Sequence, residues 1–165
     1  MPENQKKYVH RIPREDCAEP KDYFKQSFSC YDFFNSVYKF LMGNFEGAIT
    51  IDFPKSFKGA VNVSPRGFAY FIRVLLTEIF GNALVRGEFN VYDGEVVFSL
   101  KVPIALKCLP ELKSIAQKSG FSFEAEEGSI TLRTKCIEDT MLYVYAQDKL
   151  SFINYLYEVF LAPAK

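Results

Sequence analysis

The chain has 165 residues, the size of one domain, and can bury a core without a disulfide or a metal. Its 20 basic and 20 acidic residues cancel, and the basic ones form no long run, so we expect no nucleic-acid partner. No apolar run approaches the roughly 20 residues of a membrane span, and no secretion signal is visible. We therefore expect no membrane partner and a cytoplasmic location.

The first half of the chain predicts an arm, a helix and two strands. Residues 1–30 are expected to form an N-terminal arm, because the first 20 are polar and carry three prolines. Apolar side chains recur at helical spacing over residues 31–44, and Gly43 is a plausible helix end. Residues 48–53 and 59–63 then alternate like strands, with a turn between them.

A longer helix is predicted over residues 65–86. Ser64 is suited to cap its N-terminus, and Pro65 fits the first helical position. One apolar stripe follows the helix, and Gly87 is expected to end it.

The second half predicts two hairpins, two helices and one more strand. Asp93 and Gly94 favour a tight hairpin turn, and Gly120 is expected to end a short helix. The predicted elements are strands 88–92 and 95–102, helix 109–120, strands 121–126 and 129–136, strand 140–146 and helix 149–161. Residues 137–165, which hold the last strand and an amphipathic helix, are expected to pack on the same domain. The sum is an α+β fold, a two-layer sandwich whose mixed, mostly antiparallel sheet is covered on one face by helices.

Aromatic, cysteine and histidine residues are interpreted as mainly structural. The 17 phenylalanines and 10 tyrosines are expected to fill a core, although an exposed aromatic face for a partner would also use them. The four cysteines lie far apart and are expected to be reduced, buried thiols: Cys17, Cys30, Cys108 and Cys136. His10 is expected at the surface. Because it is the single histidine of the sequence, a multi-histidine metal site is excluded.

Two segments carry a resemblance to a known family. FAYFIRVLLTEIFGNALVRG, residues 68–87, resembles the N-box helix of the GHKL ATP-binding superfamily, which includes histidine-kinase catalytic domains and gyrase. SGFSFEAEEGSITLRTKC, residues 119–136, looks like the closing hairpin of that fold. The resemblance covers residues 31–136 and implies a GHKL ATPase-like domain.

The resemblance also implies roles for two side chains. In the family the asparagine of the box holds the Mg²⁺ that bridges the nucleotide phosphates, which is the position of Asn82. The glutamate one turn earlier activates the attacking water or orients a residue that does, which is the position of Glu78. The spacing i and i+4 would place both on one helix face.

The rest of the family's nucleotide site is missing from the sequence. The segment FSLKVPIALK, residues 98–107, contains neither the aspartate nor the glycines of the family's D-x-G-x-G element. The following LKCLPEL has no glycine-rich lid, and Glu111 would repel a phosphate there. Glu78 and Asn82 are therefore interpreted as vestigial, and we expect no cofactor.

Three hypotheses follow for the function. The first is a catalytically degenerate histidine-kinase-type ATPase-like domain that acts as a regulatory or scaffold protein, with a protein partner or self-association through residues 140–161. Those residues could instead cover the open face of the sheet. The second is an active ATPase or kinase domain with a reduced lid that binds Mg-ATP through Glu78 and Asn82. The third is a small-molecule sensor that uses the old nucleotide cleft.

Overall fold

The computed structural model describes residues 19–45, 47–54, 58–79, 84–137 and 150–161. In chain order its elements are β1 (Gln26–Ser29), α2 (Cys30–Asn44), β2 (Ile49–Asp52), β3 (Ala60–Val63), α3 (Pro65–Ile79), β4 (Val85–Tyr92), β5 (Glu95–Lys101), α4 (Leu109–Ser119), β6 (Ser122–Glu126), β7 (Ser129–Lys135) and α6 (Phe152–Leu161).

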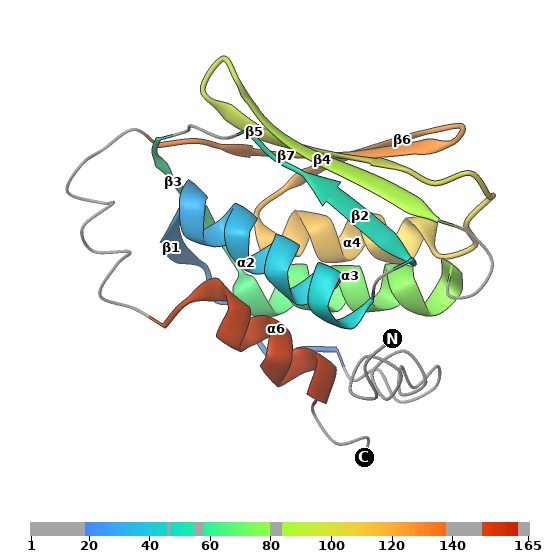
Figure 1. Cartoon of the computed structure of the whole chain (residues 1–165), viewed down its shortest axis with the longest axis horizontal. Helices are drawn as coiled ribbons and strands as arrows, with labels where there is room; N and C mark the ends of the chain where they lie inside the picture. The colour runs from blue at the N-terminus through green and yellow to red at the C-terminus, as the bar shows by residue number, and fades with distance from the viewer. Residues whose placement is uncertain (1–18, 46, 55–57, 80–83, 138–149, 162–165) are drawn as a thin grey trace.

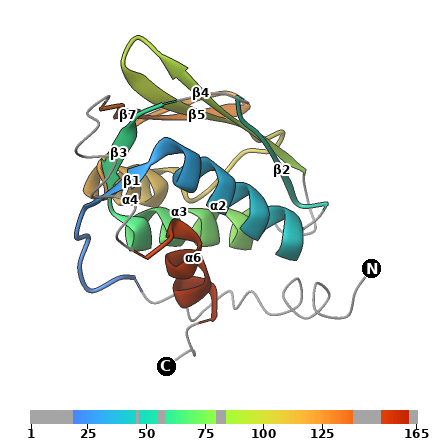
Figure 2. The same ribbon diagram turned by 60° about the vertical axis from the view of Figure 1, so that its left-hand side comes forward.

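The main sheet has five strands in the order β2-β4-β5-β7-β6. Strand β2 pairs with β4 in parallel, and the other neighbours pair antiparallel. Helices α2, α3 and α4 lie on one face of this sheet, and α6 lies on the far side of that helical layer (Figure 1). Strands β1 and β3 form a separate two-stranded sheet beside the helices (Figure 2). The predicted α+β sandwich with a mixed, mostly antiparallel sheet is confirmed.

Phenylalanine rings fill the space between the layers. The Phe33 ring on α2 packs edge-on against Phe68 of α3, Phe89 of β4 and Phe152 of α6, with centroid distances of 5.1, 5.1 and 4.8 Å. All four side chains are fully buried. Such edge-to-face contacts add to the free energy gained from burying the rings. The prediction that phenylalanines mainly form the core is confirmed for the described part of the chain.

Two local signals in the sequence produce the predicted structure. The Ser64 hydroxyl accepts a hydrogen bond from the Gly67 amide at 3.0 Å, so it caps α3 as expected. At the turn between β4 and β5, Asp93 and Gly94 both have positive φ angles, 48° and 77°. This is the pairing that a tight type I′ hairpin requires.

The predicted C-terminal end of the long helix is wrong. Helix α3 extends to Ile79, and Val85 already begins β4, so Gly87 is a strand residue and not a helix end. Residues 84–87 alternate between exposed and buried, which is the two-residue period of a strand. A Cβ atom at Gly87 would come within 2.5 Å of the Ile51 side chain, so the close approach of β2 explains the glycine.

Strand β1 was not predicted, because it falls inside the segment interpreted as an arm. It is only four residues long, and Phe28 is its one large apolar residue, so its alternation is too short to recognise. It pairs with β3, which buries Phe28. The predicted strand 140–146 lies outside the described residues, as do His10 and Cys17, and the last helix begins at Phe152 rather than at 149.

Candidate functional site

Glu78 lies in the last turn of α3 and contacts the connection between β5 and α4. Its Oε2 atom accepts a hydrogen bond from the Lys107 amide at 2.6 Å, and its Oε1 atom accepts one from the Cys108 amide at 2.9 Å. Cys108 immediately precedes α4 and provides no side-chain cap for that helix. Both carboxylate oxygens of Glu78 therefore stabilise the entry into α4.

The connection is also attached at its other end. The Val102 amide donates a hydrogen bond to the Gly128 carbonyl in the turn between β6 and β7, at 3.0 Å. Residues 102–108 thus run between a contact with the hairpin and a contact with α3. This short segment contains no glycine.

Asn82 lies outside the described residues, as does the rest of 80–83. The predicted pairing of Glu78 with Asn82 therefore stays a prediction. No group of three or more His, Cys, Asp or Glu side chains in the described part of the chain is arranged to hold a metal ion.

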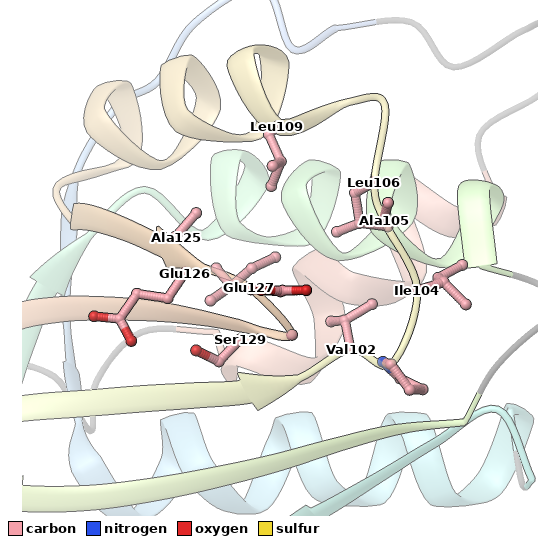
Figure 3. A pocket seen from close by; sticks show the side chains of 12 residues that line it. Val102, Ile104, Ala105, Leu106, Leu109, Ala125, Glu126, Glu127 and Ser129 are labelled. Carbon is pink, nitrogen blue, oxygen red and sulfur yellow. The ribbon is translucent and has the colours of Figure 1, made fainter.

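A cavity of about 490 Å³ lies between the connection, the start of α4 and the β6–β7 turn. Its wall is mainly apolar and includes Val102, Ile104, Leu106, Leu109, Ala125 and Ile130. Figure 3 shows the Glu127 carboxylate among these side chains, whereas the Glu126 carboxylate points away from them. Sequence reasoning missed this cavity, because its walls come from segments whose proximity no local pattern encodes.

A second hollow of about 430 Å³ adjoins the first along Pro103 and residues 127–129. Arg86 and Lys101 line it. They are partners in the register between β4 and β5, so they point to the same face of the sheet. The end of the sheet thus presents an apolar cavity on one side and two cations on the other.

Two of the described thiols, Cys30 and Cys108, have raised pKa values that make them poor nucleophiles. Burial raises the pKa of the Cys108 thiol to about 12, and the neighbouring Glu78 carboxylate adds to the shift. Burial raises the pKa of Cys30 still further, and Cys136 contributes because the two sulfur atoms lie 3.8 Å apart. All three thiols are free, as predicted, although Cys108 is only partly buried. A thiol that keeps its proton at neutral pH is a poor nucleophile.

The described part of segment 140–161 packs one side of α6 against the helical layer. Phe152 and Leu156 of α6 are fully buried, and α6 contacts α2 and α3 rather than the open face of the sheet. The Asp32 carboxylate on α2 accepts hydrogen bonds from the Ser151 hydroxyl at 2.5 Å and from the Phe152 amide at 2.8 Å. Leu150, just before the helix, remains 64% exposed.

None of the helices among the described residues is both long and apolar enough to cross a bilayer. No protein-family model matches the chain, and a search of curated proteins finds no match.

Solved structures of histidine kinases have a similar arrangement. Acinetobacter baumannii histidine kinase AdeS is 9% identical, with 82% of this chain and 76% of that chain covered and a TM-score of 0.45. The cytoplasmic segment of histidine kinase QseC is 13% identical, with 72% and 80% covered and a TM-score of 0.45. The catalytic domain of histidine kinase ThkA is 10% identical, with 72% and 98% covered and a TM-score of 0.46. These are histidine kinases, as are members of the superfamily that the two sequence segments resemble.

Proposed function

We propose that this protein is a catalytically inactive, histidine-kinase-like domain that acts as a regulatory or scaffold protein through protein–protein contacts. The observation that carries the proposal is the engagement of Glu78. A general base must offer a free oxygen to the water or hydroxyl that it deprotonates. Both oxygens of Glu78 instead accept backbone amides of the connection to α4, which supports a structural role.

The described residues do not fit a magnesium nucleotide. The segment 98–107 offers no carboxylate to accept the adenine amino group and no glycine to let the backbone approach the ring. Glu111 stands in the first turn of α4, where a phosphate would need a positive environment. The connection is held at both ends instead of being free to close over a ligand. Each feature supports a domain that has lost ATP binding.

Calorimetry with Mg-ATP and Mg-ADP tests this proposal directly. We expect no heat of binding and no rise in melting temperature, because binding to the folded state alone would raise its stability. A rise in melting temperature that Asn82→Ala abolishes would overturn the proposal and establish an active nucleotide site.

The proposed contact surface is segment 140–161, in a protein that we place in the cytoplasm. Leu150 is an exposed apolar residue of this segment, and it lies beside the buried start of α6. Leu150→Asp is expected to lower self-association, measured by light scattering, without changing the melting temperature. Leu84→Asp, the same change at an exposed leucine outside this segment, serves as the matched control. If Leu150→Asp leaves the mass distribution of an associating protein unchanged, the contact lies elsewhere.

A further inference from the structure

Strand β6 is the outer strand of the five-stranded sheet at the end opposite β2. Its one described partner is β7, with the Glu126–Ser129 pair closing the turn. In an antiparallel ladder every second residue turns its amide and carbonyl towards the partner, and the residues between turn theirs away. Counted from the closing pair, Phe123 and Ala125 direct these groups to the open side. The edge therefore offers backbone hydrogen bonds to an added strand.

The two faces of this edge differ in chemistry. On the helix side, Phe123 is half-buried beside Phe71 of α3, with a centroid distance of 6.4 Å. Ala125 follows on the same side and lines the 490 Å³ cavity together with Leu109. A strand added to β6 would project alternate side chains towards this apolar side.

The opposite face of the edge is acidic. Glu124 and Glu126 are exposed there. Neither forms an ion pair with another residue of the described ranges. The cations on the neighbouring strands are offset from them, because Arg133 faces Ser122 and Lys101 faces Ser129 in the register. This row of carboxylates is free to meet positive charges from outside.

We propose that β6 is a docking edge for an extended segment of a partner protein in which basic and apolar residues alternate. The partner strand pairs with Phe123 and Ala125 through its backbone. Its basic side chains lie beside Glu124 and Glu126, and an apolar side chain enters the cavity next to Ala125. The inference rests on the proposed function in naming a protein as the partner, and it places a second contact away from segment 140–161.

The test uses a seven-residue peptide of alternating lysine and valine, blocked at both ends and labelled with fluorescein. We expect saturable binding by fluorescence anisotropy, and slower amide hydrogen exchange at Phe123 and Ala125 in the ¹⁵N-labelled protein. The double variant Glu124→Gln/Glu126→Gln is expected to bind about tenfold more weakly, because two exposed charge pairs are lost. Ala125→Lys is expected to abolish binding, since it places a cation at the cavity and leaves the strand backbone unchanged.

Matched controls separate strand addition from general attraction. A peptide of the same composition, with the lysines together and the valines together, is expected to bind at least tenfold more weakly, because its side chains cannot match both faces. Glu111→Gln, which removes an exposed charge from α4, is expected to leave binding unchanged.

Equal binding of the two peptides, or protection only outside residues 122–127, would overturn the proposal. An absence of saturable binding at millimolar peptide would do the same. These results are distinguishable from the nucleotide test. Binding of Mg-ATP would overturn the proposed function and leave the edge intact, whereas failure of the peptide would leave the nucleotide result unchanged.

Discussion

Two carboxylates hold the starts of two helices, and the sequence indicates a role for only one of them. Asp32 on α2 accepts hydrogen bonds from Ser151 and Phe152 at the start of α6. Glu78 on α3 accepts two backbone amides at the start of α4. Asp32 belongs to no recognisable motif, whereas Glu78 lies in the segment that resembles the N-box and was interpreted as a vestigial base. A carboxylate that caps a helix start and one that serves chemistry look alike in a sequence, because their partners are remote.

The largest effect is expected at Asp32. Asp32→Ala should lower the free energy of unfolding by about 2–4 kcal/mol, since it removes a charged, partly buried acceptor of two hydroxyls, from Ser36 and Ser151, and of the Phe152 amide. Circular dichroism during urea unfolding measures this loss, because the chain has no tryptophan. Asp52→Ala, at an exposed position of β2, is the control and should change stability by less than about 0.5 kcal/mol. Equal losses in both variants would show that Asp32 does not specifically stabilise the start of α6.

A smaller effect is expected at Glu78. Glu78→Gln should lower the free energy of unfolding by about 1–2 kcal/mol, because an amide side chain replaces a charged acceptor of two backbone amides. Hydrogen exchange at the Lys107 and Cys108 amides should accelerate in this variant. If Glu78 had no structural role, Glu78→Gln would leave the free energy of unfolding and the two exchange rates unchanged, or would raise the stability.

The Glu78 site should also reveal itself through pH. Burial raises the pKa of the Cys108 thiol to about 12 in the folded state, whereas the ordinary value of 9 applies to the unfolded chain. The free energy of unfolding is therefore unaffected by this thiol below pH 9, and it falls as the pH rises from about 9 to 12. Melting temperatures between pH 8 and 11 should decline less steeply in Cys108→Ser than in the original protein. If melting temperature declined equally with pH in both proteins, the raised pKa of Cys108 would be contradicted.

The smallest effect concerns a surface contact of α6. Arg66 donates a hydrogen bond to Glu158 at 2.9 Å and lies over the Tyr155 ring. Both charged side chains are more than one-third exposed, so Arg66→Gln should lower stability by only about 0.5 kcal/mol. Urea unfolding in low and high salt checks it, since salt should reduce the difference. A loss as large as that of Asp32→Ala would mean that the surface pair, rather than the carboxylate cap, fixes α6.

Local signals account for the parts of the fold that the sequence predicted. The cap at Ser64 and the Asp93–Gly94 turn depend on neighbours within three residues, so they can be recognised without tertiary information. The end of α3 was missed because Leu84 and Val85 continue an apolar pattern, yet β4 begins at Val85 and pairs with β2 and β5. Tertiary pairing overrode the helical pattern there.

The candidate site was less predictable than the fold. The contacts of Glu78 join residues about 30 positions apart, and the cavity depends on where the β6–β7 turn meets the connection. The sequence showed that residues 98–107 contain neither aspartate nor glycine. It could not show that Glu78 supports the connection between β5 and α4, because that depends on the packing of α3 against α4.

The late position of α6 in the chain has a consequence for synthesis on the ribosome. Phe152 and Leu156 complete the layer against α2 and α3, yet they leave the exit tunnel only after every strand of the main sheet has done so. Until then the nascent chain exposes the rings of Phe28 and Phe33 that Phe152 will cover. Prematurely terminated chains that lack α6 should therefore be chaperone clients, and proteases should digest them under conditions that spare the chain with α6 in place.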